Sequence, residues 1–252
     1  MPNPDLPRKK NGFPSRIRAL GRLAFRWILL LIAGSMAITI IFRWLPVPCS
    51  SLMIQQQVAS LWQQDKEYRF RYRWVELGKI SPSAPLAVIA SEDQKFLNHL
   101  GFDFEAIEKA WEHNQRRKRV HGASTISQQL AKNLFLWPGR SFIRKGLEVY
   151  FTLLLEGLWP KRRIIEVYLN VVEFGPGIFG VEAASKAYFR KPAARLSSAE
   201  AALLAATLPS PLRANPARPT GYLRQRAAQI QQQMQLMGGL SLLKPLGQKP
   251  KK

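Results

Sequence analysis

Cysteine and histidine are scarce in this chain. One cysteine, Cys49, and three histidines occur among its 252 residues. A single cysteine excludes an internal disulfide, and it has no partner cysteine or nearby histidine with which to bind a metal. Acidic residues are also few, because 16 Asp and Glu stand against 38 Lys and Arg, giving a formal net charge of +22. Such a basic chain favours partners that carry phosphates or anionic membrane surfaces.

Strand patterns and long apolar runs are also rare. With 46% apolar residues, the chain can bury one substantial core, and a second large domain would not fit. A nucleic-acid partner is not expected. The basic run Arg116-Arg-Lys-Arg119 is accompanied by no zinc finger, recognition helix or aromatic RNA motif.

The one long apolar run predicts a membrane anchor. Sixteen uncharged residues extend from Trp27 to Phe42, with Arg26 and Arg43 at the two ends. Interfacial tryptophans and snorkelling arginines can extend this run to about the 20 residues that a spanning helix needs. Seven Lys and Arg precede Trp27, so the positive-inside rule places the N-terminus in the cytoplasm. A cleaved signal peptide and a buried core helix are the alternatives, but no convincing cleavage site follows the run.

The rest of the chain predicts a mainly α-helical domain. We expect residues 1–26 to form a basic cytoplasmic tail without regular structure, 27–45 the anchor, 46–79 a linker and the start of the domain beyond the membrane, 80–217 the main part of that domain, and 218–252 a C-terminal helix and basic tail. Residues 68–74 are left open between a strand and an extended arm. Apolar periodicity predicts helices over 58–62, 86–97, 104–114, 125–135, 142–158, 162–169, 180–189, 198–208 and 222–237.

The first chemical motif centres on Glu92. On the helix expected over 86–97, Glu92 lies on one apolar stripe with Val88 and Phe96. A carboxylate at such a place is a suitable general base. The alternative is a structural ion pair between Glu92 and Lys95. His99, considered alone, is expected to be structural.

The second motif is a polar segment that begins an amphipathic helix. Thr125 and Gln128 fit a capping box, while Ile126, Leu130 and Leu134 form the expected buried stripe. The segment also gathers groups suited to sugar hydroxyls and phosphate oxygens. These candidate substrate-binding residues are Ser124, Thr125, Gln128, Gln129, Lys132 and Asn133. One well-capped helix without a ligand is the alternative.

The third motif places bases before an acid. Arg144 and Lys145 precede Glu148 by four and three residues, the spacing of helical ion pairs. This order is the less favourable one for helix stability, so we expect Glu148 to have another role. Arg140 adds a further positive charge just upstream.

Together these segments resemble the peptidoglycan glycosyltransferase family, in its monofunctional biosynthetic transglycosylase form. The same module occurs in class A penicillin-binding proteins. The resemblance spans about residues 80–217. Its motifs are Glu92-Asp-Gln-Lys-Phe-Leu-Asn-His99, Gly122-Ala-Ser-Thr-Ile-Ser-Gln-Gln129 with Lys132-Asn133, Arg144-Lys145-Gly-Leu-Glu148, Lys161 to Asn170, Gly180 to Phe189 and Leu208 to Pro216.

The resemblance implies a lysozyme-like glycosyltransferase domain with a small membrane-proximal subdomain. It implies two catalytic glutamates. Glu92 would deprotonate the 4-hydroxyl of the incoming lipid-linked disaccharide, and Glu148 would assist departure of undecaprenyl pyrophosphate. Lys132, Arg140, Arg144 and Lys145 would supply positive charge to that leaving group. Glu166, Tyr168 and Asn170 are interpreted as scaffold.

The resemblance also implies partners and a location. The substrates would be lipid II and the nascent glycan chain, joined by β-(1,4) linkages with inversion. No organic cofactor is expected. Glu148 would assist the leaving group either through a divalent cation, magnesium or manganese, or by orienting Lys and Arg side chains. The single-pass protein would sit in the cytoplasmic (inner) membrane among cell-wall or division proteins, with its catalytic domain in the periplasm.

Two rival functions remain open on the sequence. A lysozyme-like lytic transglycosylase would cleave peptidoglycan with a similar glutamate, because a fold does not fix the direction of a reaction. The basic set after Gly122 favours a pyrophosphate leaving group over an uncharged glycan. A non-catalytic basic membrane scaffold is the second rival, and it would not need Glu92.

Overall fold

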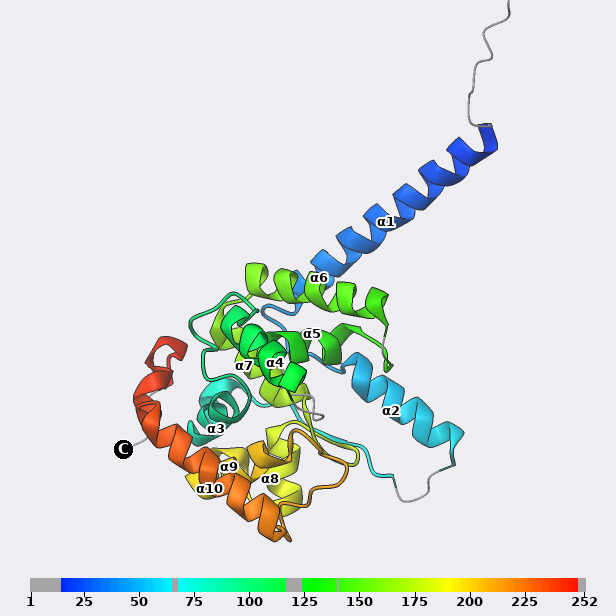
Figure 1. Ribbon diagram of the computed structural model, residues 1–252. Helices are drawn as coiled ribbons and strands as arrows, with labels where there is room; N and C mark the ends of the chain where they lie inside the picture. Colours follow the sequence, from blue (N-terminus) through cyan, green and yellow to red (C-terminus); the bar gives the residue numbers. More distant parts are fainter. Residues whose placement is uncertain (1–14, 65–67, 117–123, 140, 249–252) are drawn as a thin grey trace, which may run out of the picture. The chain divides into compact units, whose positions relative to one another are not determined.

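The computed structural model describes residues 15–64, 68–116, 124–139 and 141–248 (Figure 1). The chain divides into two units, Met1–Ile41 and Phe42–Lys252. The described part of the first unit is one helix, α1 (Ser15–Ile41), whose segment Ala19–Ile41 is long and apolar enough to cross a membrane. The expected unstructured tail is therefore wrong for residues 15–26, because the helix begins well before the apolar run.

The second unit is mainly helical, as predicted. Its α-helices are α2 (Ser51–Trp62), α3 (Ser83–Glu92), α4 (Phe104–Arg116), α5 (Ile126–Phe135), α6 (Phe142–Leu158), α7 (Lys161–Val171), α8 (Val181–Phe189), α9 (Ser198–Thr207) and α10 (Gly221–Leu236). Three 3-10 helices are η1 (Leu77–Lys79), η2 (Ala193–Arg195) and η3 (Gly239–Leu246).

A small sheet joins two distant parts of this unit. β1 (Arg71–Tyr72) pairs in parallel with β3 (Ile178–Phe179), and β3 pairs antiparallel with β2 (Glu173–Gly175). The segment that the sequence left open over 68–74 therefore contains a two-residue strand within an otherwise extended arm.

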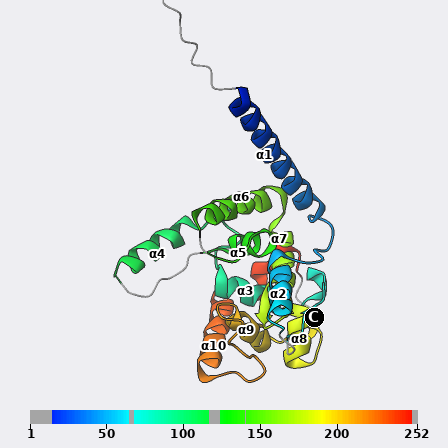
Figure 2. The ribbon, with the colours of Figure 1, turned by 90° about the vertical axis from the view of Figure 1, so that its right-hand side faces the viewer.

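Helix α7 lies at the centre of the core. Ile164, Val167 and Tyr168 have no exposed surface. An amphipathic helix turns its apolar face to the core. Helices α5 and α6 lie to one side of α3, and α9 and α10 lie on the other (Figures 1 and 2). Helix α3 therefore ends between two helical layers.

The chain after α1 is fixed to α7 through Arg163. This buried guanidinium donates hydrogen bonds to the backbone oxygens of Phe42 and Leu45 and forms an ion pair with Glu166. It also lies over the ring of Trp74, 4.9 Å from the centroid. A buried guanidinium needs several acceptors, and here the backbone just after α1 provides two of them.

A buried carboxyl group in the small sheet provides a test of how pH affects stability. Glu173 is buried, and burial raises the pKa of its carboxyl group, while a hydrogen bond from the Gln56 amide opposes the rise. A pKa raised in the folded chain means that this group contributes less stability as pH rises above its ordinary value of 4.5. We therefore expect Glu173→Gln to raise the Tm more at pH 8 than at pH 5.

Thermal unfolding in detergent at the two pH values measures this difference. Glu76→Gln is the matched control, because Glu76 is exposed and its one ion pair among the described residues is with Lys79, at 3.2 Å. An equal shift of Tm at both pH values in Glu173→Gln would contradict the role given to burial.

Candidate active site

Glu92 is the last residue of α3. The expected helix over 86–97 ends five residues early because Asp93 leaves the helical conformation (φ −162°, ψ 77°). Val88 and Glu92 share the helix, but the prediction that Phe96 continues their stripe is wrong. Phe96 is fully buried from a turn instead. Glu92 thus stands at a helix end, where its side chain can meet neighbouring elements.

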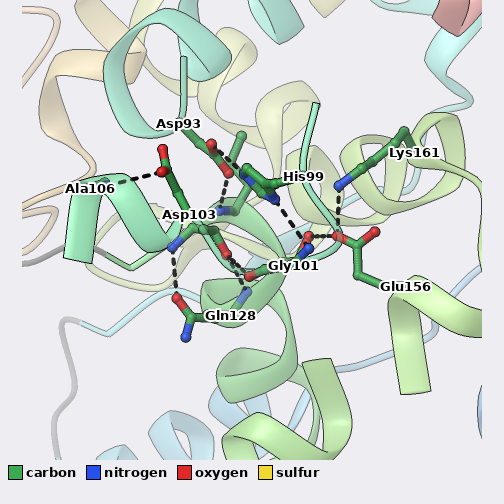
Figure 3. A network of polar contacts seen from close by, with 11 residues as sticks. Asp93, His99, Gly101, Asp103, Ala106, Gln128, Glu156 and Lys161 are labelled. Carbon is green, nitrogen blue, oxygen red and sulfur yellow. Dashed lines mark hydrogen bonds and ion pairs between the residues drawn. The ribbon is translucent and has the colours of Figure 1, made fainter. Parts of the chain in front are cut away.

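Asp93 explains why the helix stops there. One carboxylate oxygen accepts the backbone N–H of Ile126, the first residue of α5, at 3.0 Å, and the other lies 2.9 Å from His99 Nε2 (Figure 3). His99 Nδ1 accepts the N–H of Gly101 at 3.1 Å. Since Nδ1 is an acceptor, Nε2 carries the hydrogen and donates a hydrogen bond to the Asp93 carboxylate. His99 is therefore structural, as expected.

The start of α5 is tied to the same network. Thr125 and Gln128 form the predicted capping box, and the Thr125 hydroxyl donates to the backbone oxygen of Gly101 at 2.7 Å. The stripe of Ile126, Leu130 and Leu134 is buried, as predicted. Gln128 is buried too. Its amide oxygen accepts the N–H of Thr125.

Glu92 is held by its neighbour Ser91 and by groups from two other helices. The Gln129 amide nitrogen donates to Glu92 Oε2 at 2.9 Å, and the Ser91 hydroxyl lies 3.2 Å from Oε1. The guanidinium of Arg226, on α10, is 3.8 Å from Oε1. The alternative ion pair with Lys95 is wrong, because Lys95 pairs with Glu105. Glu92 remains partly exposed, so a substrate hydroxyl can reach it.

Glu148 is more deeply buried than Glu92, and its nearest partners are positively charged. It is 4% exposed, with Lys145 Nζ 2.6 Å from one carboxylate oxygen and Arg144 3.7 Å from the other. The helical ion pairs thus form in spite of their less favourable order. Arg144 Nε is buried and has no hydrogen-bond partner among the described residues. A buried unpaired donor is costly, and a substrate oxygen would satisfy it.

Lys132 links the two glutamates electrostatically. Burial lowers the pKa of its ammonium group, the negative charges of Glu148 and Glu92 raise it, and the positive charges of Arg144 and Lys145 lower it. All four charged groups are therefore close enough to Lys132 to act on it. Within the described ranges, Lys132 forms no ion pair of 4.0 Å or less. Its ammonium group is available to a phosphate.

The remaining predicted site residues differ in their exposure to solvent. Ser124 is exposed and lines a hollow of about 280 Å³ with Glu92, Asp93, Asp103 and Thr125. Asn133 is buried. Arg140 lies outside the described residues. The structure therefore brings Glu92, Gln129, Lys132, Arg144, Lys145 and Glu148 into one neighbourhood, and it uses Thr125 and Gln128 for capping.

Three residues of this neighbourhood were not identified as site residues from the sequence. Asp93 follows Glu92, but its partners lie on distant segments. Arg226 belongs to the helix that the sequence placed after the catalytic domain, and it is one of many arginines. Tyr168 was interpreted as scaffold, yet its hydroxyl donates to Gln129 Oε1 at 2.7 Å. Only tertiary contacts identify these three.

The residues around Glu148 do not fit a divalent cation held by the protein. Magnesium prefers several oxygen ligands, whereas Glu148 faces Lys145 and Arg144. No group of three His, Cys, Asp or Glu side chains suited to a metal occurs in the part of the chain that the structure describes.

Comparisons with known proteins show which family the chain resembles over most of its length. The sequence model of the family described as "Transglycosylase" matches residues 56–235. The chain is 51% identical over 235 residues to the biosynthetic peptidoglycan transglycosylase of Pasteurella multocida, covering 92% of this chain and 96% of that protein. It is 55% identical over 203 residues to the protein of that name from Haemophilus influenzae, covering 80% and 82%.

A third relative, the biosynthetic peptidoglycan transglycosylase of Cronobacter sakazakii, is 53% identical over 220 residues, which are 87% of this chain and 91% of that protein. The family model covers more than half of the chain, including both glutamates and Arg226. The resemblance found in the sequence motifs is therefore confirmed, and the chain belongs to the transglycosylase family.

Proposed function

We propose that this chain is a peptidoglycan glycosyltransferase that lengthens glycan strands from lipid II and releases undecaprenyl pyrophosphate. The observation that carries the proposal is the contrast between two carboxylates. Glu92 is partly exposed and held by hydrogen-bond donors, while Glu148 is buried between two cations. One suits proton removal, and the other suits the organisation of positive charge.

Glu92 acts as the general base. The 4-hydroxyl oxygen of the acceptor sugar attacks the anomeric carbon of the donor, and its proton passes to the Glu92 carboxylate. The donor is α-linked to pyrophosphate and the new linkage is β-(1,4), so the displacement inverts the anomeric carbon. Base and leaving group then act on opposite faces of the sugar.

The leaving group departs toward the positive side chains of α5 and α6. The bond between the anomeric carbon and the pyrophosphate oxygen breaks, and its electron pair leaves with the pyrophosphate. Lys132, Arg144 and Lys145 stabilise the negative charge that develops there. Glu148 orients Lys145 and Arg144. Any magnesium or manganese ion would have to rely mainly on substrate oxygens.

The basic cluster favours synthesis over cleavage. A lytic enzyme acts on a glycan whose leaving group is an uncharged sugar, and it has no use for three cations beside the reaction. A phosphorylated donor uses them all. The relatives at 51–55% identity are named biosynthetic transglycosylases, which favours the same direction.

Location and partners extend the proposal. Helix α1 anchors the chain in the cytoplasmic membrane as a single span, and the catalytic unit works on the periplasmic side beside cell-wall or division proteins. The basic segment before the apolar run supports this orientation. The small subdomain implied by the family would lie nearest to the membrane.

The reaction's direction can be measured with purified lipid-linked disaccharide. Detergent-solubilised protein should convert a fluorescent substrate into long products that lysozyme digests. A fluorescent penicillin should not label the protein. Shortening of preformed glycan strands without elongation would favour the lytic alternative.

Substitutions of the two glutamates should impair the enzyme in different ways. Glu92→Gln keeps the side chain's shape but removes the base, so turnover should fall about 10²–10⁴-fold. Its affinity for a moenomycin-type phosphoglycolipid, which imitates the growing chain, should persist. Glu148→Gln removes the partner of Lys145 and Arg144, so that affinity should change along with turnover.

Titration of both variants with the phosphoglycolipid, and polymerisation at pH 5–9 with and without magnesium, measures these effects. Exposed Glu108→Gln, on α4, is the control substitution. Near-normal turnover in Glu92→Gln would overturn the assigned base. Wild-type inhibitor affinity and turnover in Glu148→Gln would overturn its role in organising charge.

The orientation can be tested with reporter fusions. A periplasm-active reporter attached after Gly239 should be active, and the same reporter at the N-terminus should be inactive. The reverse pattern would show that the catalytic unit faces the cytoplasm. Replacing the basic residues Arg22 and Arg26 by Gln should weaken the preference.

A further inference from the structure

We propose that Gln129 and Tyr168 are positioning residues that orient the Glu92 carboxylate for proton removal. The inference rests on the proposed role of Glu92 as the base. It changes two interpretations made from the sequence, because Gln129 was expected to bind substrate and Tyr168 to serve as scaffold. Both residues act here through Glu92.

A chain of two hydrogen bonds joins three helices. The Tyr168 hydroxyl, on α7, donates to Gln129 Oε1 at 2.7 Å, and Gln129 Nε2, on α5, donates to Glu92 Oε2 at 2.9 Å. Glu92 itself ends α3. The base therefore takes its orientation from two helices to which it does not belong.

The direction of the chain follows from the chemistry of the amide. A carboxylate can only accept, so the nitrogen of Gln129 must face Glu92 and the oxygen must face Tyr168. Tyr168 has no exposed surface, and burial, with the charges of Glu92 and Asp93, holds the pKa of its phenol well above the ordinary value. The phenol thus keeps its proton and remains a donor.

These two hydrogen bonds leave the other carboxylate oxygen of Glu92, Oε1, less constrained. Glu92 Oε2 is held by Gln129, while Oε1 has the Ser91 hydroxyl at 3.2 Å and the Arg226 guanidinium at 3.8 Å. A base that must meet a hydroxyl in one geometry loses rate when it rotates. The hydrogen bond to Oε2 limits that rotation. The Tyr168 hydroxyl, bound to the amide oxygen of Gln129, in turn holds the Gln129 amide in place.

The charged and titratable groups facing Glu92 come from several elements. They are Arg226 on α10, Lys132 on α5, Tyr168 on α7 and the neighbouring Asp93. Among them, only Tyr168 is connected to Glu92 through an intervening amide. Removing its hydroxyl changes the orientation of the base without removing any charge.

The decisive variant is Tyr168→Phe, which removes one buried oxygen and keeps the ring. We expect kcat for polymerisation to fall by about tenfold, and up to about 100-fold if the carboxylate rotates freely. KM and affinity for a moenomycin-type phosphoglycolipid should stay at wild-type values. The acidic limb of the pH–rate profile should move to higher pH, because a carboxylate with a weakened donor binds its proton more tightly.

Tyr188→Phe is the matched control. The Tyr188 hydroxyl is partly buried and lies 3.3 Å from the backbone oxygen of Phe174, so the same chemical change is made at a tyrosine with no contact to Glu92. Its kcat and pH–rate profile should match those of the wild type. Equal effects of the two substitutions would overturn the inference in favour of a general packing role.

Gln129→Leu provides a second, independent test. It removes the amide that connects Tyr168 to Glu92, so the double variant with Tyr168→Phe should lose no more activity than Gln129→Leu alone. Additive losses of activity in the double variant would overturn the proposed connection from Tyr168 through Gln129 to Glu92. If Tyr168→Phe fails to fold, Gln129→Leu still has to show the lower kcat, the unchanged inhibitor affinity and the shifted acidic limb.

The outcomes separate this inference from the proposed function. An active Glu92→Gln enzyme would remove the base itself and the function assigned to it. An inactive Glu92→Gln enzyme together with wild-type kcat and pH dependence in Tyr168→Phe would overturn the positioning role alone.

Discussion

The hydrogen bond between the Asp93 carboxylate and the first N–H of α5 determines the rest of the site. It ends α3 at Glu92 and joins that end to the helix that carries Gln129 and Lys132. A negative side chain at a helix N-terminus is favourable, because the free N–H groups there need acceptors. The same carboxylate fixes His99, which in turn fixes the backbone at Gly101. A capping interaction between distant segments thereby sets the place of the proposed base.

The site separates two electrostatic tasks between helices. Around Glu92, the nearest contacts are neutral donors, with one guanidinium at 3.8 Å. Around Glu148, two cations lie within ion-pair distance, and Lys132 stands where both carboxylates act on it. Proton removal and charge stabilisation need different surroundings, and in the proposed mechanism α3 and α6 provide them separately.

The sequence was sufficient for features that depend on local patterns. Apolar spacing predicted the main helices, and the Thr125–Gln128 capping box was predicted from four neighbouring residues. The length of α3 was not, because its end depends on a contact between Asp93 and Ile126, 33 residues away. Arg226 and Tyr168 were missed for the same reason. Their importance comes from helices packing together, and no spacing within one segment encodes it.

The bonds from Arg163 to the backbone at Phe42 and Leu45 show where the catalytic unit begins. Helix α1 ends at Ile41, and the next residue, Phe42, is already bound by Arg163 of α7. The first residues of this unit therefore depend on a side chain that lies 121 residues further along the chain. A substitution of Arg163 would loosen a segment that is remote from it in sequence.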